Sequence, residues 1–196
     1  MSLVLDPAAQ DLLFRAAHTA NTFTDEPVTE EQVRAIYDLV KYGPTAFNQT
    51  PLRVTLVRSP EARERLVQHM AEGNRPKTAT APLVAILAAD NEFHEELPTL
   101  FPAFPAAKDA FFAERPARER SAALNSALQA AYFIVGVRAA GLAAGPMTGF
   151  DPEGVRKEFL DDDHTPLMVV NIGRPGPDAS YPRSPRLAYE DVVTTV

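Results

Sequence analysis

Four short segments of the sequence carry polar side chains and glycines in the arrangement of a ligand-binding site. They are His18-Thr19-Ala20-Asn21, the loop at residues 43–51, Asn74-Arg75-Pro76-Lys77 and Gly145-Pro146-Met147-Thr148-Gly149-Phe150-Asp151. Their hydroxyl, amide, imidazole and ammonium groups can donate hydrogen bonds, and the glycines let backbone N–H groups approach a ligand closely. The chemistry is that of noncovalent binding. Taken singly, each segment also fits a capped helix end, a turn or a solvated loop.

Other kinds of catalytic chemistry have little support. The chain has no cysteine, which excludes thiolate nucleophiles, disulfides and cysteine-ligated metal centres. The 4 histidines, at positions 18, 69, 94 and 164, do not stand at metal-ligand spacings. The sequence also lacks the P-loop, the G-x-G-x-x-G fingerprint, the nucleophile elbow and H-E-x-x-H. We therefore expect no metal centre.

Charge and hydropathy limit the partners. A net charge of −7 and a pI near 5.1 oppose general binding to nucleic acid. No apolar run approaches the roughly 18 residues of a membrane span, and the N-terminus lacks the basic and then apolar pattern of a signal peptide. We expect a cytoplasmic protein with one domain over residues 1–196, because a chain that is 45% hydrophobic at this length can bury a single core.

Periodic patterns predict the elements that position the four segments. Helices are expected from Asp6-Pro7 to about Ala20, from the capping box at Thr29 to Gly43-Pro44, from Ser59 to about Gly73, and from Ser121 to Ala140. Strands are expected at residues 52–58, 83–89 and 166–172, and residues 93–120 are expected to be irregular.

The helix at 121–140 is the longest pattern in the chain. Small and apolar residues, among them Leu124, Ala127, Leu128 and Ala131, cover most of its circumference. This favours a helix at the centre of the core. The element order predicts an α+β (mixed α/β) fold, with one modest sheet covered by helices.

Together the four segments resemble the FMN-dependent nitroreductase family over nearly the whole chain. The most specific likeness is the run from Pro146 to Asp151, supported by Asn74 with Lys77 and by Pro44-Thr45-x-x-Asn48. The closing run from Pro185 to Glu190 is also similar. The resemblance implies a nitroreductase-like fold, with a central, mostly antiparallel sheet flanked by helices and a long buried core helix. It also implies a homodimer that holds FMN at its interface.

The resemblance implies cofactor-binding roles for residues that match the family's motifs. Arg183 and Arg186 correspond to phosphate-binding positions, Asn74 and Lys77 to positions facing the ribityl chain and pyrimidine edge, and Thr148 and Gly149 to backbone donors near flavin N5. The remaining matched residues are His18, Thr19 and Asn21 near the N-terminus, Pro146, and the loop residues Pro44, Thr45 and Asn48 from the partner subunit. The family's leading arginine is replaced by Ala17.

The implied activity is hydride transfer from NAD(P)H through flavin N5, with no catalytic side-chain nucleophile. The stretches at 37–41, 97–102, 129–132 and 145–147 are similar to the malonic semialdehyde reductase branch of pyrimidine degradation, which forms 3-hydroxypropionate. Two alternatives stay open: a broad nitroaromatic or quinone reductase, and a flavin-binding protein without turnover. Five phenylalanines at residues 93–112 suggest a lid over the flavin or a satellite hydrophobic cluster.

Overall fold

The centre of the molecule is a four-stranded antiparallel sheet in the order β1-β2-β4-β3. The structure is a computed structural model that describes residues 3–177 and 179–196. The strands are β1 (Leu52–Val57), β2 (Leu83–Asp90), β3 (Ala143–Met147) and β4 (His164–Gly173). This architecture confirms the expected α+β class.

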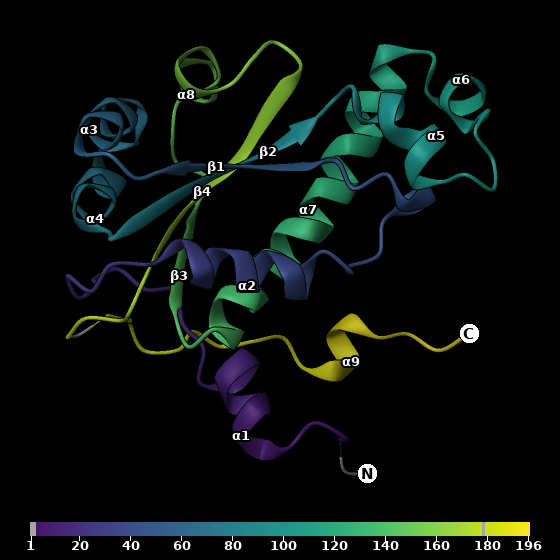
Figure 1. Cartoon of the computed structure of the whole chain (residues 1–196). Helices are drawn as coiled ribbons and strands as arrows, with labels where there is room; N and C mark the ends of the chain where they lie inside the picture. The colour runs from purple at the N-terminus through teal and green to yellow at the C-terminus, as the bar shows by residue number, and fades with distance from the viewer. Residues whose placement is uncertain (1–2, 178) are drawn as a thin grey trace.

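Helices cover both faces of the sheet (Figure 1). The longer helices are α2 (Glu30–Val40), α3 (Pro60–His69), α7 (Arg115–Ala139) and α8 (Pro152–Phe159). Shorter helices are α1 (Pro7–Gln10), α4 (Arg75–Thr80), α5 (Leu97–Leu100), α6 (Ala107–Phe112) and α9 (Tyr189–Val192). A π-helical segment follows α1 at Asp11–Arg15, and 3₁₀ turns occupy Ala46–Asn48, Glu72–Asn74 and Phe93–Glu96.

Strand β2 explains why helices are needed on both sides. All eight of its residues are buried, and successive side chains of a strand point to opposite faces. Leu83, Ala85 and Leu87 pack into the cluster formed with α2 and α7. Val84 and Ile86 pack into the second cluster, which includes residues of α3 and α8. No described helix is long and apolar enough to cross a membrane.

Helix α2 begins where the capping box predicts. The Gln32 N–H donates to Thr29 Oγ1 at 3.2 Å, and the Thr29 N–H donates to Gln32 Oε1 at 2.9 Å. Two otherwise unsatisfied N–H groups of the first turn are therefore paired.

The first helix is shorter than predicted. Helical structure ends at Arg15, and the chain continues beside β3, where the Ala20 N–H donates to Ala144 O at 3.1 Å. The Asn21 N–H donates to Ala179 O at 2.7 Å. These tertiary hydrogen bonds outweigh the helical preference of an alanine-rich stretch. His18 and Asn21 consequently lie on an extended segment and not at a helix end.

Helix α7 is buried on one face only. Ala130, Phe133 and Val137 are buried, whereas Leu124 is 65% exposed and Leu128 is 46% exposed. The prediction of a core helix is therefore confirmed for one face of α7. The small and apolar residues on which the prediction was based lie largely on the exposed face. The helix also begins earlier than expected, at Arg115. Most of the segment before it, which was expected to be irregular, forms the 3₁₀ turn at Phe93–Glu96 and helices α5 and α6.

Two other predictions need correction. Strand β3 was not expected, because its sequence Ala-Ala-Gly-Pro-Met has low strand propensity. It is accommodated because it pairs with β4 along one side only, at the edge of the sheet. Helix α3 ends at His69 and not near Gly73 as predicted. The residues from Asn74 to Lys77 form the end of a short turn and the start of α4, and not a solvated loop.

We expect Gly136→Ala to destabilise the crossing of α2 and α7. A Cβ atom at Gly136 would lie 2.3 Å from Val40 Cγ1 and 3.2 Å from Ile36 Cγ2. Overpacking of this kind costs about 1–3 kcal/mol, measurable as the free energy of urea unfolding. The matched control is Gly73→Ala, where a Cβ would meet no heavy atom within 4 Å; its effect should stay within about 0.5 kcal/mol. Equal stability of the two variants would contradict this packing.

Candidate functional site

Three segments far apart in the sequence meet at the end of β3. Asn74 Nδ2 donates to Gly149 O at 2.9 Å, and Lys77 Nζ donates to Asn21 Oδ1 at 3.4 Å. Asn74 precedes α4 and Lys77 lies within it. The structure therefore brings together four residues that the family resemblance implies as cofactor-binding: Asn21, Asn74, Lys77 and Gly149.

The turn after β3 is held against the end of α3. The Ala71 N–H donates to Gly149 O at 3.0 Å, and the Asp151 N–H donates to His69 O at 2.7 Å. Asp151 then begins α8 by accepting from the Glu153 N–H. These bonds orient the turn, and Asp151 has a capping role here.

Close packing favours glycine at position 149. A Cβ atom there would lie 2.7 Å from Asn74 Nδ2 and 3.4 Å from Ala71 Cβ. A larger residue would displace the Asn74 amide. Within the described part of the chain, the N–H groups of Thr148 and Gly149 donate no hydrogen bond. They are therefore available to a ligand acceptor. Pro146 lies half-buried inside β3, just before this turn.

A polar cavity of about 540 Å³ continues the site beyond Asn21. Its walls combine the extended N-terminal segment, one residue of α7 and the C-terminal segment. The lining residues are Phe14, Ala17, His18, Thr19, Asn21, Arg138, Tyr181, Pro182, Arg183, Ser184 and Arg186. Five of the nominated residues thus converge here: His18, Thr19, Asn21, Arg183 and Arg186.

The cavity is rich in positive charge that no described carboxylate neutralises. Arg183 Nη2 donates to Arg15 O at 2.6 Å and to Ala17 O at 2.8 Å. Arg186 Nη1 donates to Ser184 O at 2.9 Å. Within the described residues, neither guanidinium forms an ion pair. An anion in the cavity would be favoured, since guanidinium groups bind phosphates and carboxylates with high geometric specificity.

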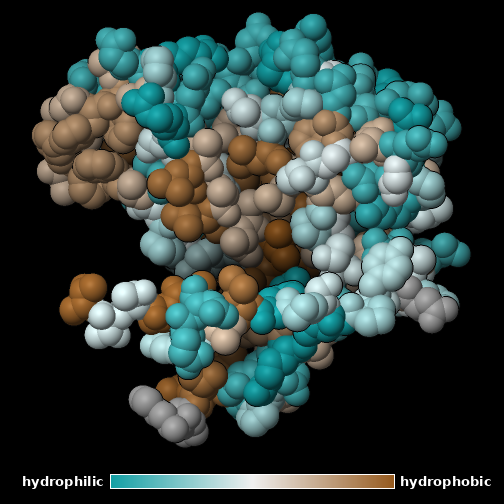
Figure 2. Space-filling view, turned by 180° about the vertical axis from the view of Figure 1, so that it is seen from behind, coloured by the Kyte–Doolittle hydropathy of each residue, from teal (hydrophilic) through white to brown (hydrophobic). Residues whose placement is uncertain are grey.

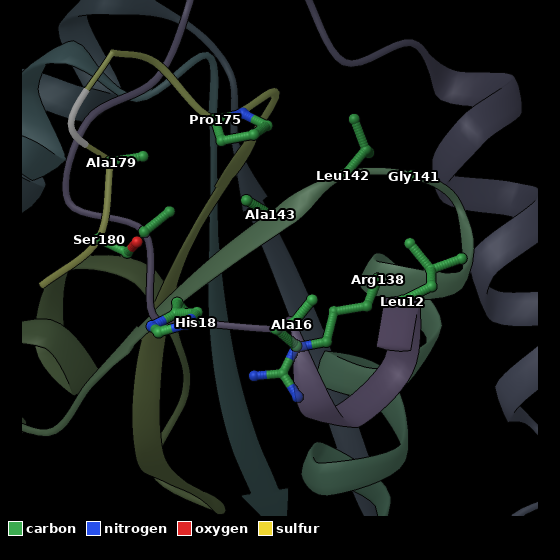
Figure 3. A pocket seen from close by; sticks show the side chains of 12 residues that line it. Leu12, Ala16, His18, Arg138, Gly141, Leu142, Ala143, Pro175, Ala179 and Ser180 are labelled. Carbon is green, nitrogen blue, oxygen red and sulfur yellow. The ribbon is translucent and has the colours of Figure 1, made fainter. Parts of the chain in front are cut away.

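Arg138 also lines the cavity, and it is not among the cofactor-binding residues that the family resemblance implies. Burial in the first place, and the neighbouring charge of Arg183 in the second, lower the pKa of Arg138. A second cavity of about 350 Å³ shares Ala17, His18 and Arg138 with the first. Figure 3 shows His18 and Arg138 among otherwise mainly small and apolar lining residues. A signal was present in the sequence, because Arg138 is the one charged residue at 121–140.

The loop residues Pro44, Thr45 and Asn48 are not part of this cluster within one chain. Their loop precedes β1, at the edge of the sheet opposite β3. Asn48 Nδ2 donates to the Leu100 carbonyl of α5 at 2.8 Å, and α5 and α4 lie on opposite sides of the molecule in Figure 1. The backbone of this loop has positive φ at Phe47 (52°) and Asn48 (50°).

One group of residues has the composition of a metal site. The ligand atoms of Glu92, His94 and Glu95 lie within 4.8 Å of one another. However, Glu92 is paired with Arg118 at 2.8 Å, and Glu95 is paired with Lys108. The two carboxylates are thus already neutralised by cations of α7 and α6. We assign these ion pairs a structural role in attaching α6 and α7 to the turn at residues 93–96.

Comparisons with known proteins identify the family of the chain and its fold. A model of the nitroreductase family matches residues 15–174. A Streptomyces coelicolor protein whose name proposes an NADH dehydrogenase/NAD(P)H nitroreductase is 88% identical over 196 residues, which cover 100% of both chains.

Solved structures show the same fold. A candidate nitroreductase from Bacillus subtilis has a TM-score of 0.88 at 22% identity, covering 97% of this chain and 100% of that one. A candidate nitroreductase from Exiguobacterium sibiricum, solved in complex with FMN, has a TM-score of 0.86 at 19% identity, covering 100% of this chain and 99% of that one. The chain described here belongs to the nitroreductase family.

Proposed function

We propose that this chain is an FMN-dependent NAD(P)H oxidoreductase. The observation that carries the proposal is the continuity between two parts of the site. Lys77 contacts Asn21, and Asn21 also lines the arginine-rich cavity. The hydrogen-bond donors near Lys77 would bind the ring system of FMN, and the cations of the adjoining cavity would bind its phosphate. The ring system and the phosphate are the two ends of FMN. The FMN complex of the Exiguobacterium structure supports this choice.

Each residue group then has a defined task. The Asn74 amide and the Lys77 ammonium lie where they would hydrogen-bond the polar edge of the ring, and the N–H groups of Thr148 and Gly149 supply backbone donors. Bound FMN would accept a hydride from NAD(P)H and pass it to a second substrate. The ammonium group of Lys77 would stabilise negative charge on the ring of bound FMN, because it is oriented before such charge develops. NAD(P)H as reductant is supported by the names of the relatives.

For the acceptor we propose malonic semialdehyde, reduced to 3-hydroxypropionate. Its carboxylate requires a cation near the ring. Arg53 does not meet this need, because it is paired with Asp90 at 2.6 Å. Arg75 is exposed beside Asn74, and Nε donates to Met70 O at 2.9 Å. We therefore assign the substrate carboxylate to Arg75. A broad nitroaromatic or quinone reductase is the second candidate, since the names of the relatives include nitroreductase.

We also propose that the active unit is a homodimer, with the FMN site completed by Pro44, Thr45 and Asn48 of the second chain. Apolar residues of α7 are exposed in the single chain, including Leu124, Leu128 and Tyr132. Apolar side chains gather across the middle of one face of the molecule, as Figure 2 shows. Gly43 packs on the Tyr132 ring, so the loop at 44–48 adjoins this apolar face of α7.

Flavin reduction tests the proposed activity. The protein should bind FMN, and anaerobic NADPH or NADH should bleach the flavin absorbance. Lys77→Gln should slow this reduction about tenfold or more in stopped-flow measurements, because a preorganised charge is lost. The control is Lys157→Gln, which removes an exposed lysine paired with Glu153 on α8. Failure of the wild-type protein to take up FMN would refute the proposal, and full activity of Lys77→Gln would refute the role of Lys77.

Steady-state kinetics distinguish the two acceptors. The wild-type value of kcat/KM should be higher for malonic semialdehyde than for a nitroaromatic compound without a carboxylate. Arg75→Gln should raise KM about tenfold for malonic semialdehyde alone, because a charge-assisted hydrogen bond to the substrate is lost. A higher kcat/KM for the nitroaromatic substrate would favour the broad reductase, and an equal rise of both KM values would exclude a role for Arg75 in binding the carboxylate.

Light scattering tests the dimer. The wild-type protein should have twice the chain mass of 21.4 kDa. Leu128→Lys should yield monomers with weakened FMN binding, because a charge buried between two α7 helices has no partner there. Gln68→Lys adds the same charge to an exposed position of α3 and should leave the mass unchanged. A wild-type monomer that binds FMN fully would rule out the composite site.

A further inference from the structure

The Arg138 side chain has the burial and the unused hydrogen-bond donors of a ligand-binding residue. It lies in the last turn of α7, and its only hydrogen bond within the described residues is from Nη1 to Leu13 O at 3.3 Å. The Nε atom is buried and has no partner among the described residues. A guanidinium group carries five N–H donors, so most of its capacity is unused in a half-buried position.

The surroundings of Arg138 leave its charge uncompensated. None of the ion pairs found in the described chain includes Arg138. Burial in the first place, and the charge of Arg183 on the same cavity in the second, lower the pKa of Arg138. Two adjacent guanidinium groups facing one cavity repel each other, and this arrangement is stabilised when an anion lies between them.

The chemistry of the cavity identifies the kind of anion. Besides Arg138 it contains the Thr19 hydroxyl, the His18 imidazole, Arg183 and Arg186. Several donors that converge from different directions match the oxygens of a phosphate monoester better than the two oxygens of a carboxylate. Ala17 stands where the family resemblance implies an arginine, and its side chain supplies no charge.

We propose that Arg138 binds the terminal phosphate of FMN, and that this α7 residue supplies the cation that Ala17 does not. The inference rests on the proposed flavin function and extends it to a residue outside the nominated set. The 2′-phosphate of NADPH has the same monoester chemistry, so the experiment must separate the two sources.

The test compares ligands with and without the phosphate. FMN and riboflavin are titrated into the apoprotein by quenching of flavin fluorescence. Arg138→Gln should raise the Kd of FMN about tenfold or more and leave that of riboflavin nearly unchanged, because one charge-assisted hydrogen bond is lost for FMN only. Arg138→Lys, which keeps the charge but loses the planar donor fork, should lie between the two.

Arg63→Gln is the matched control. Arg63 is also half-buried, its Nη2 atom donates to one backbone carbonyl, Pro82 O, at 3.2 Å, and burial lowers its pKa. It lines a cavity that shares no residue with that of Arg138. Its substitution should leave the ratio of the FMN and riboflavin Kd values unchanged. Circular dichroism of each variant checks that the fold is intact.

Several outcomes would overturn the inference. Equal losses for FMN and riboflavin would show that Arg138 acts structurally, through Leu13. An unchanged FMN Kd together with a raised KM for NADPH but not NADH would assign Arg138 to the nicotinamide cofactor. If the wild-type protein prefers FMN to riboflavin and Arg138→Gln keeps that preference, the inference fails while the proposed function stands. If the wild-type protein binds neither flavin, the proposed function itself fails.

Discussion

The burial of β2 on both faces is the constraint on which the rest of the molecule depends. A strand in which every residue is buried must be central in its sheet and must be covered on both faces. Helices α2 and α7 supply one cover, and α3 and α8 supply the other. The binding residues implied by the family resemblance accordingly do not lie on this strand. They lie at the edges of the sheet, where chain segments can leave the core and present backbone N–H groups.

The two edges carry different halves of the proposed site. The β3 edge holds the turn at Gly149, the Asn74 and Lys77 side chains and the extended segment with Asn21. The β1 edge follows the loop of Thr45 and Asn48. Three interstrand spacings, each about 4.8 Å, separate these edges within one chain. In the proposed homodimer the second set of residues comes from another copy of the chain, and the exposed apolar face of α7 is suited to bring that copy into contact.

Local charge in this molecule differs in sign from the total charge. The chain carries a net charge of −7, and many of its arginines are paired with carboxylates, as Arg53, Arg118 and Arg156 are. The arginines that line the polar cavity, Arg138, Arg183 and Arg186, form no ion pair with a carboxylate of the described residues. An acidic protein can in this way hold an anionic ligand, because the potential inside a cavity is set by the nearest fixed charges.

The sequence by itself determined the class of fold, the capped start of α2 and the buried strand β2, and its family resemblance nominated most residues that meet at the candidate site. These follow from local rules: capping, apolar runs and short motifs around Asn74 and Gly149. Only the tertiary structure decided three other features. It ended the first helix at Arg15 because the next residues bond to β3, it made a strand of a glycine- and proline-containing segment, and it exposed the Leu124 and Leu128 face of α7.

The same distinction applies to Arg138. Arg138 lies within a helix and belongs to no recognisable motif. A sequence pattern cannot show that its guanidinium group shares a cavity with that of Arg183, which lies 45 positions further along the chain. Burial, hydrogen-bond pairing and uncompensated charge depend on which segments pack together. Those segments are separated in sequence by the whole core, so the packing of the core decides where the proposed phosphate-binding residues meet.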